Sequence, residues 1–225
     1  MNICDNIKKI IQLNTKQAVA LRKEKELKPD GSFVSKGDLL IQEKVEEYTE
    51  GLGDEYFLIS EEKDNSGFSF DQYTYAIIID PVDGTENFVS GLKEWGVGVS
   101  VYQAGKHLES LIALPELDLY IQSGDTFPKY ESRIYGISSS LTREQLQSLE
   151  QGYEYRIIGC AMYNMYNVIT GSYALFQNPK GAYIWDLLPG LNLALENNCK
   201  VTVEGKPYGG EFLSPDRTYR FRVEH

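Results

Sequence analysis

The sequence predicts an α/β fold with two sheets, because two different patterns follow one another along its 225 residues. In the first half, short apolar and β-branched runs succeed one another with turn residues between them, which is typical of antiparallel strands. After Pro128 strand-like and helix-like segments alternate, which favours a mixed or parallel sheet. We therefore expect an antiparallel first sheet in residues 1–128 and a mixed second sheet in residues 129–225, joined in one compact unit.

Helices flank the first sheet in this prediction. Apolar residues at helical spacing from Ile3 to Leu21 indicate one or two amphipathic helices, and a further helix is expected from about Gly37 to Tyr48. The expected strands of the first half are residues 56–60, 73–79, 96–103, 108–114 and 117–123, with a hairpin turn at 104–106. In the second half, strands are expected at 133–137, 155–158, 173–176 and 200–203, and helices at 142–151, 161–170 and 186–197.

Composition narrows the class of protein. A formal net charge of −11 argues against nucleic-acid polymers and anionic membrane surfaces as partners. The three cysteines have no framework spacing, which favours a reducing compartment. The N-terminus shows no signal peptide and no continuous apolar span, so we expect a cytoplasmic protein.

One segment carries the strongest chemical signal. The apolar run 75–79 predicts a buried strand, and it is followed at once by Asp80-Pro81-Val82-Asp83-Gly84-Thr85. We expect the strand to end at Pro81, which has no N–H to donate. Two carboxylates three residues apart can hold a hard divalent cation, and Gly84 lets the backbone pass close to an anion. Taken alone, the segment is equally typical of a β-turn.

Four more acidic residues, in three segments, have structural as well as functional interpretations. Glu61 and Glu62 follow a short strand, where paired acids are usually solvated loop charges. Asp186 begins a helical pattern, so it is either an N-cap or a carboxylate directed at a metal. Asp38 lies three residues after Ser35, which is a capping-box spacing.

In chain order, Asp38, Glu61-Glu62, the Asp80 to Thr85 segment and Trp185-Asp186 resemble the motifs of the inositol monophosphatase and fructose-1,6-bisphosphatase superfamily. The segment Arg156 to Ala161 is also similar to a strand-to-helix segment of these lithium-sensitive, magnesium-dependent phosphatases. The resemblance implies a layered α/β/α/β/α sandwich, a homodimer and hydrolysis of a phosphomonoester.

The resemblance also implies a set of metal ligands. Glu61, Asp80 and the carbonyl of Val82 would hold a first metal, and Asp80, Asp83 and Asp186 a second. Ligands that are all hard oxygens suit Mg²⁺ better than zinc. Two or three Mg²⁺ ions are expected, with Mn²⁺ as a substitute and Li⁺ or Ca²⁺ as inhibitors.

By the same resemblance, the catalytic residues are Asp38, Thr85 and Glu61. Thr85 paired with Asp38 would take a proton from the attacking water, while N–H groups at Gly84 and Thr85 would bind phosphate oxygens. Other phosphatase chemistries fail on the sequence, because it has no Cys followed six residues later by Arg, no Asp-x-Asp at Asp80 and no P-loop.

Substrate choice is the least determined property. Animal-type inositol monophosphatases carry a Glu where this chain has Pro179, followed by Lys180, which could meet a second phosphate. Three candidates remain: an inositol or sugar phosphatase, a bisphosphate nucleotidase acting on adenosine 3′,5′-bisphosphate, or a non-catalytic relative that serves as a binding or assembly module.

Overall fold

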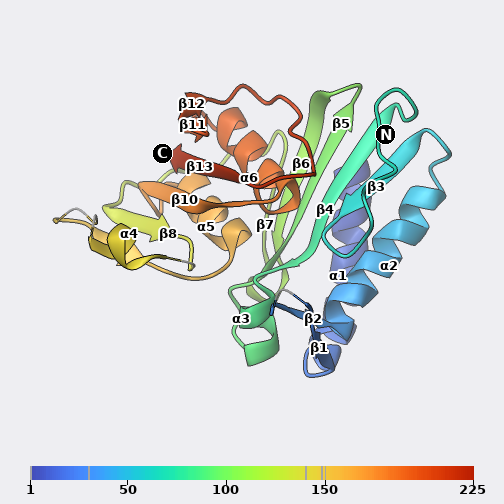
Figure 1. Ribbon diagram of the computed structural model, residues 1–225, viewed down its shortest axis with the longest axis horizontal. Helices are drawn as coiled ribbons and strands as arrows, with labels where there is room; N and C mark the ends of the chain where they lie inside the picture. The colour runs from blue at the N-terminus through green and yellow to red at the C-terminus, as the bar shows by residue number, and fades with distance from the viewer. Residues whose placement is uncertain (1, 30, 140, 148, 150) are drawn as a thin grey trace.

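Two β-sheets and two pairs of helices divide the chain into layers (Figure 1), in a computed structural model that describes residues 2–29, 31–139, 141–147, 149 and 151–225. Helices α1 (Ile3–Leu21) and α2 (Lys36–Glu50) cover one face of the first sheet. Helices α5 (Ala161–Ile169) and α6 (Ile184–Glu196) cover its other face and separate it from the second sheet.

The first sheet has the order β3-β4-β5-β6-β7. Its strands are β3 (Tyr56–Ser60), β4 (Tyr75–Asp83), β5 (Gly96–Gln103), β6 (Lys106–Leu114) and β7 (Leu119–Gln122). Within β4, Ile77 and Ile79 pack in the core beneath α1 and α2, whereas Ile78 packs in the core with α5 and α6. Because helices cover both faces, the strand is apolar without alternation, as the sequence predicted.

The second sheet has the order β12-β11-β13-β10-β8-β9 and is mixed, as predicted. It consists of β8 (Ile134–Ile137), β9 (Glu154–Arg156), β10 (Leu175–Ala182), β11 (Lys200–Val203), β12 (Lys206–Pro207) and β13 (Tyr219–Glu224). Strand β8 is parallel to both β9 and β10, and the remaining pairs are antiparallel.

Short elements complete the chain. Strands β1 (Lys25–Leu27) and β2 (Phe33–Ser35) form a separate antiparallel hairpin before α2. Helix α3 (Thr85–Ser90) follows β4 directly, and the 3₁₀ turn η1 (Pro115–Leu117) joins β6 to β7. Helix α4 (Arg143–Gln147) lies beside β8, with no described side chain fully buried. No described helix is both long and apolar enough to cross a membrane.

The structure corrects the predicted direction of one strand and the predicted end of another. Strand β3 is parallel to β4, so the first sheet is antiparallel only from β4 to β7. Residues 61–74 are long enough to carry the chain back for parallel pairing. Strand β4 does not end at Pro81 but continues to Asp83 through an irregularity in its pairing with β5, where a missing N–H is tolerated. The N-terminal helical pattern is a single helix.

Strands β1, β2, β12 and β13 were not predicted, and several other elements differ in length from the prediction. The hairpin of β1 and β2 is short and mostly exposed, so its sequence lacks an apolar pattern. Strand β13 alternates buried Tyr219, Phe221 and Val223 with more exposed residues, a period-2 signal that the prediction overlooked. Strand β10 extends to Ala182, β9 ends at Arg156, and α4 ends at Gln147. The predicted helix 142–151 includes residues 148 and 150, which lie outside the described residues.

Candidate active site

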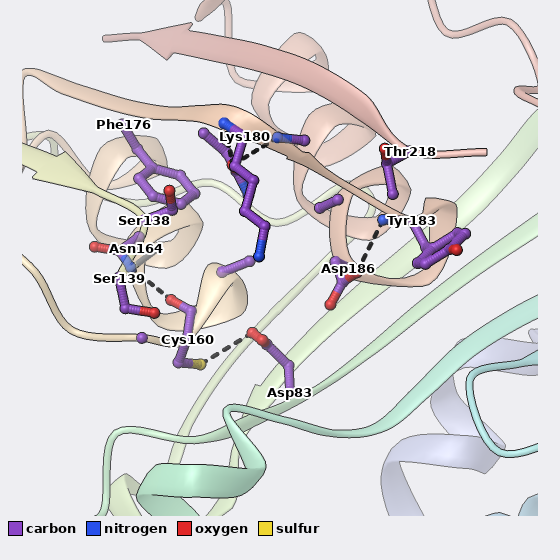
Figure 2. Close-up of a pocket in the computed structure, with 15 residues that line it drawn as sticks. Asp83, Ser138, Ser139, Cys160, Asn164, Phe176, Lys180, Tyr183, Asp186 and Thr218 are labelled. Atoms are coloured by element: carbon purple, nitrogen blue, oxygen red, sulfur yellow. Dashed lines mark hydrogen bonds between the residues drawn. The ribbon is translucent and has the colours of Figure 1, made fainter. Parts of the chain in front are cut away.

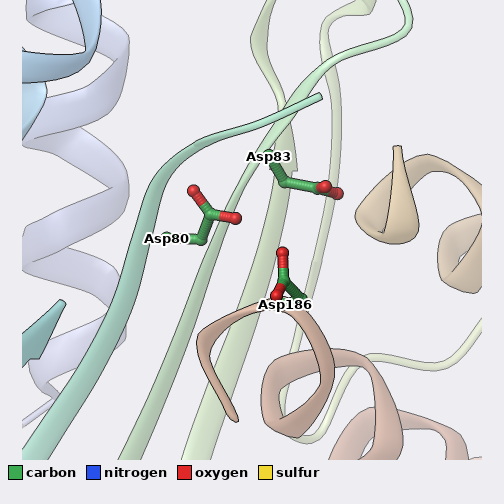
Figure 3. A group of neighbouring side chains, drawn as sticks. All are labelled: Asp80, Asp83 and Asp186. Atoms are coloured by element: carbon green, nitrogen blue, oxygen red, sulfur yellow. The ribbon is translucent and has the colours of Figure 1, made fainter. Parts of the chain in front are cut away.

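Three carboxylates meet where the end of β4 approaches the start of α6. Asp80, Asp83 and Asp186 can each offer one oxygen so that these atoms all lie within 4.8 Å of one another. Figure 3 shows Asp80 and Asp83 coming from β4 and Asp186 from the first turn of α6, around one shared space. Asp80 is only 1% exposed and Asp83 is 6% exposed. The structure therefore brings together three of the predicted metal ligands.

Local hydrogen bonds fix the direction of each carboxylate. The Val82 N–H donates to Asp80 Oδ1 at 3.0 Å. Asp83 Oδ2 accepts from the Cys160 thiol at 3.0 Å and from the Met162 N–H, both at the start of α5. These two contacts were not predicted, although the segment that ends at Ala161 resembles a family segment. They anchor Asp83 to the second half of the chain.

Asp186 is not the N-cap of α6. Tyr183 occupies that position, and Asp186 Oδ2 accepts the Tyr183 N–H at 3.0 Å from the third helical position. This bond uses one oxygen and leaves the other directed at Asp80 and Asp83 (Figure 3). The N-cap interpretation of Asp186 is therefore wrong, and its capping-box contact with Tyr183 orients the carboxylate toward the cluster.

The cluster is electrostatically strained without a cation. Burial, with the charges of Glu61, Asp83 and Asp186 added, raises the pKa of Asp80 well above its ordinary value. Burial also raises the pKa of Asp83 to about 6, although hydrogen bonds from Cys160 and Met162 act in the opposite direction. Asp80 Oδ2 is buried and has no hydrogen-bond partner among the described residues. An unpartnered buried oxygen within an all-carboxylate cluster fits a hard divalent cation.

Glu61 is held away from the three-carboxylate group. The Lys28 ammonium bonds Glu61 Oε1 at 2.9 Å and Glu62 Oε1 at 2.5 Å, so it bridges the two acids after β3. Burial alone would lower the Lys28 pKa, but Glu61 and Glu62 raise it above its ordinary value. The charge of Glu61 still contributes to the raised pKa of Asp80. Sequence reasoning missed Lys28, which lies 33 residues from Glu61.

Thr85 lies between two of the predicted site residues. Its Oγ1 is 3.2 Å from Asp38 Oδ1 and 3.0 Å from the Val82 carbonyl oxygen, and it can donate to either. Asp38 forms the predicted capping box with Ser35, which donates through its N–H and its hydroxyl to Asp38 Oδ2. Asp38 therefore both caps α2 and faces Thr85. Burial raises its pKa, although the bonds from Ser35 and Thr85 favour the charged form.

Gly84 occupies a position that only glycine fits. It precedes α3 with φ 81° and ψ 43°, in the left-handed region. A Cβ added here would lie 2.9 Å from Cys160 Cβ and 3.1 Å from the Gly159 carbonyl oxygen. Gly84 thus lets β4 turn into α3 directly against the chain before α5. Phosphate binding by the N–H groups of Gly84 and Thr85 remains a prediction.

A cavity of about 370 Å³ opens beside the carboxylates (Figure 2). Asp83 and Asp186 lie on one side, and Lys180 extends into it from β10. Its other polar side chains are Ser138, Ser139, Asn164, Asn178, Tyr183 and Thr218. These polar residues were not predicted, because they come from separate strands and loops and share no motif.

The family of the chain follows from comparison with known proteins. Residues 2–126, more than half of the chain, match the model of the inositol monophosphatase family, so the chain belongs to that family.

Individual relatives are distant. An uncharacterized protein of Sinorhizobium fredii, y4fL, is 25% identical over 131 residues, which cover 50% of this chain and 47% of the relative. This chain therefore spans about half the length of the curated relative that it matches.

Solved structures confirm the fold class. A staphylococcal inositol monophosphatase-1 shares 20% identity with a TM-score of 0.82, over 99% of this chain and 88% of that one. An IMPase from Thermotoga maritima shares 22% identity with a TM-score of 0.81, over 100% and 92%. An IMPase/NADP phosphatase in complex with Mg²⁺ and phosphate shares 21% identity with a TM-score of 0.80, over 98% and 91%. The chain has the layered α/β architecture of these proteins.

Proposed function

We propose that this protein is a Mg²⁺-dependent phosphomonoesterase that hydrolyses a small soluble phosphate ester by in-line attack of water. The observation that carries this proposal is the group formed by the buried Asp80 and Asp83 with the half-buried Asp186, in which Asp80 Oδ2 is unpartnered among the described residues. The three carboxylates repel one another, and the fold nevertheless keeps them together. Asp80 and Asp83 lie in the part of the chain that matches the phosphatase family.

Two or three Mg²⁺ ions are the expected cofactors, and the residues present offer ligands for two of them. Asp80, Asp83 and Asp186 would hold one of them, and Asp80 with the Val82 carbonyl and Glu61 would hold another once Glu61 leaves Lys28. Bound there, Mg²⁺ lowers the pKa of water and neutralises phosphoryl and leaving-group charge. Mn²⁺ is the expected substitute because it accepts the same oxygen ligands, and Li⁺ or Ca²⁺ are expected inhibitors.

The side chains themselves would move the proton. Thr85 lies within hydrogen-bond distance of Asp38, so its oxygen can accept a proton from the attacking water while its own proton passes to Asp38. Burial raises the pKa of Asp38, which favours this acceptance. The water oxygen then bonds phosphorus as the bond to the leaving alkoxide breaks. N–H groups at Gly84 and Thr85 orient the phosphoryl oxygens through these steps.

The cavity supports a small substrate. Its volume of about 370 Å³ suits an inositol or sugar phosphate, or adenosine 3′,5′-bisphosphate. Similar structures include an IMPase/NADP phosphatase bound with inositol 1-phosphate and another complexed with NADP and Ca²⁺. Both substrate classes therefore belong to the proposal. We further propose that the protein is a cytoplasmic homodimer and that it binds neither nucleic-acid polymers nor membranes.

Phosphate release from inositol 1-phosphate, fructose 1,6-bisphosphate and adenosine 3′,5′-bisphosphate tests the function, with Mg²⁺ present and then chelated. We expect release that requires Mg²⁺ and falls about 100-fold or more in Asp186→Asn, because this change removes a ligand charge. The exposed Asp118→Asn is the matched control and should keep full activity. Release that survives chelation would refute the proposed chemistry.

The second candidate function, a non-catalytic binding module, gives a different result. Such a protein would bind Mg²⁺, measured by calorimetry, and yet release no phosphate from any member of the panel. The structure favours catalysis over this alternative because Thr85 and Asp38 are placed within hydrogen-bond distance beside the carboxylates. A module that only binds has no need of that pair.

A further inference from the structure

An irregular segment of β10 places a lysine at the cavity beside the carboxylates. The pairing of β10 with β13 shifts between Asn178 and Ala182. Within this bulge, Asn178 Oδ1 accepts the N–H groups of Lys180 at 3.2 Å and Gly181 at 3.0 Å, and Gly181 has φ 101°. Bulges next to active sites commonly redirect a side chain. Here the bulge presents Lys180 to the cavity rather than to the outer face of the sheet.

The Lys180 side chain extends into the cavity, toward the side formed by Cys160 and Asp83 (Figure 2). It is the one Lys, Arg or His among the described residues that line this cavity. No described carboxylate lies within 4.0 Å of its ammonium group, although Asp83 and Asp186 line the same space. The Lys180 ammonium group thus lies at the substrate cavity without a carboxylate partner among the described residues.

Neighbouring groups on the same wall are suited to a polar ligand. Ser138 follows β8 and donates its N–H to the Gln177 carbonyl at 3.2 Å, which carries its side chain next to the bulge. Ser138 Oγ is buried without a hydrogen-bond partner among the described residues. Asn178 and Thr218 also line the cavity here. Lys180 is itself exposed, but it lies beside these polar groups at the cavity.

We propose that Lys180 binds a second anionic group of the substrate, so that the preferred substrates are small bisphosphates rather than monophosphates. This inference rests on the proposed function, in which the scissile phosphate lies against Asp80, Asp83 and Asp186. Once cations neutralise these acids, the charge of Lys180 is the uncompensated one in the cavity. A cavity of about 370 Å³ has room for a substrate that reaches from the acids to the bulge.

Matched substrates test this assignment. Wild-type protein and Lys180→Gln are compared on adenosine 3′,5′-bisphosphate and adenosine 3′-monophosphate, and on fructose 1,6-bisphosphate and fructose 1-phosphate. A charge-assisted contact is worth about 10- to 100-fold in binding. We expect Lys180→Gln to lower kcat/KM for the bisphosphates by about that factor, mainly through KM, and to change monophosphate hydrolysis roughly threefold or less. The exposed Lys206→Gln is the matched control.

The outcomes separate this inference from the proposed function. Equal losses on both members of a pair would mean that Lys180 contacts the scissile phosphate, and no loss on either would mean that it is only solvated; each result overturns the inference. If no substrate is hydrolysed, the proposed function fails, and a binding measurement then decides whether Lys180 contacts a second anionic group. Calorimetric binding of adenosine 3′,5′-bisphosphate must then be weaker in Lys180→Gln, and equal affinity overturns the assignment.

Discussion

Replacing Asp83 with Asn tests whether the carboxylate cluster destabilises the fold in the absence of a cation. Burial raises the pKa of Asp83 from the ordinary 3.8 to about 6. A carboxyl group with a raised pKa in the folded state holds its proton longer than the unfolded chain does. Its destabilising effect is therefore absent below about pH 3.8, grows as the pH rises, and is complete above about pH 6.

The magnitude follows from that change in pKa. Each tenfold change in a dissociation constant is worth about 1.4 kcal/mol, so a rise from 3.8 to about 6 corresponds to about 3 kcal/mol. The Met162 N–H and the Cys160 thiol both bond Asp83 Oδ2, so an Asn whose amide oxygen takes that place keeps both contacts. These bonds weaken when the acceptor is no longer charged, which removes about 1 kcal/mol of the gain. We expect Asp83→Asn to be about 2 kcal/mol more stable than wild type at pH 7 in chelator.

The assay is urea unfolding at several pH values between 4 and 7, with chelator and then with Mg²⁺. In chelator, the advantage of Asp83→Asn should be small at pH 4 and full above pH 6. For a chain of 225 residues, 2 kcal/mol corresponds to a rise in Tm of about 4–8 °C. Mg²⁺ should stabilise wild type, by about 2.7 kcal/mol at one hundred times its Kd, and should stabilise the variant much less.

Two results would refute this reasoning. The first is an Asp83→Asn variant that is no more stable than wild type in chelator at pH 7. The second is equal stabilisation of both proteins by Mg²⁺, which would show that Asp83 is not a ligand. Asp118→Asn removes one acidic charge at an exposed position and controls for the change in net charge.

Three further predictions use other residues. Thr85→Val removes the hydroxyl that bonds Asp38, so kcat should fall about 10²- to 10⁴-fold while Mg²⁺ still stabilises the fold in thermal unfolding; unchanged kcat would exclude Thr85 from proton transfer. Lys28→Met frees Glu61, so Mg²⁺ should bind about tenfold more tightly by calorimetry, and weaker binding would contradict a competition between Lys28 and the cation. Burial lowers the pKa of His107 below its ordinary 6.5, so the unfolded chain takes up this proton first and wild type loses stability as the pH falls below about 6.5. In urea unfolding, the free energy of unfolding of His107→Gln should fall less steeply below about pH 6.5 than that of wild type. An unchanged dependence on pH would contradict a role for His107.

Local patterns in the sequence predicted most of the layers correctly. The apolar run in β4 indicated a buried strand. The structure confirms this, since Ile77 and Ile78 point to opposite faces and pack in different cores. The direction of β3 was not predictable in the same way, because parallel pairing depends on where residues 61–74 cross and not on the residues of β3. Strand β13 was a different failure, since its alternation was present in the sequence and was overlooked.

At the site, too, the residues that belong to local motifs were predicted, and the residues that contact them from distant parts of the chain were not. Motif order placed Asp80, Asp83 and Asp186 in one site, and the structure brings them together. The partners that orient them were out of reach, because Cys160 lies 77 residues from Asp83 and Lys28 lies 33 residues from Glu61. Side-chain contacts across such separations depend on the packing of the whole fold, which neither spacing nor composition encodes.

The same contacts explain why activity and stability are opposed at this site. Asp83 is held in place by Cys160 and Met162 although burial disfavours its charge, and Asp80 keeps an oxygen that no described residue satisfies. A bound cation should offset this loss of stability, because a ligand that binds only the folded state stabilises that state. Lys28 offsets part of the repulsion at Glu61 but does not reach the three-carboxylate group. Substitutions that relieve the repulsion should therefore stabilise the protein in chelator and weaken its affinity for Mg²⁺ in the same measure, and a variant that gained both would require a different account of the cluster.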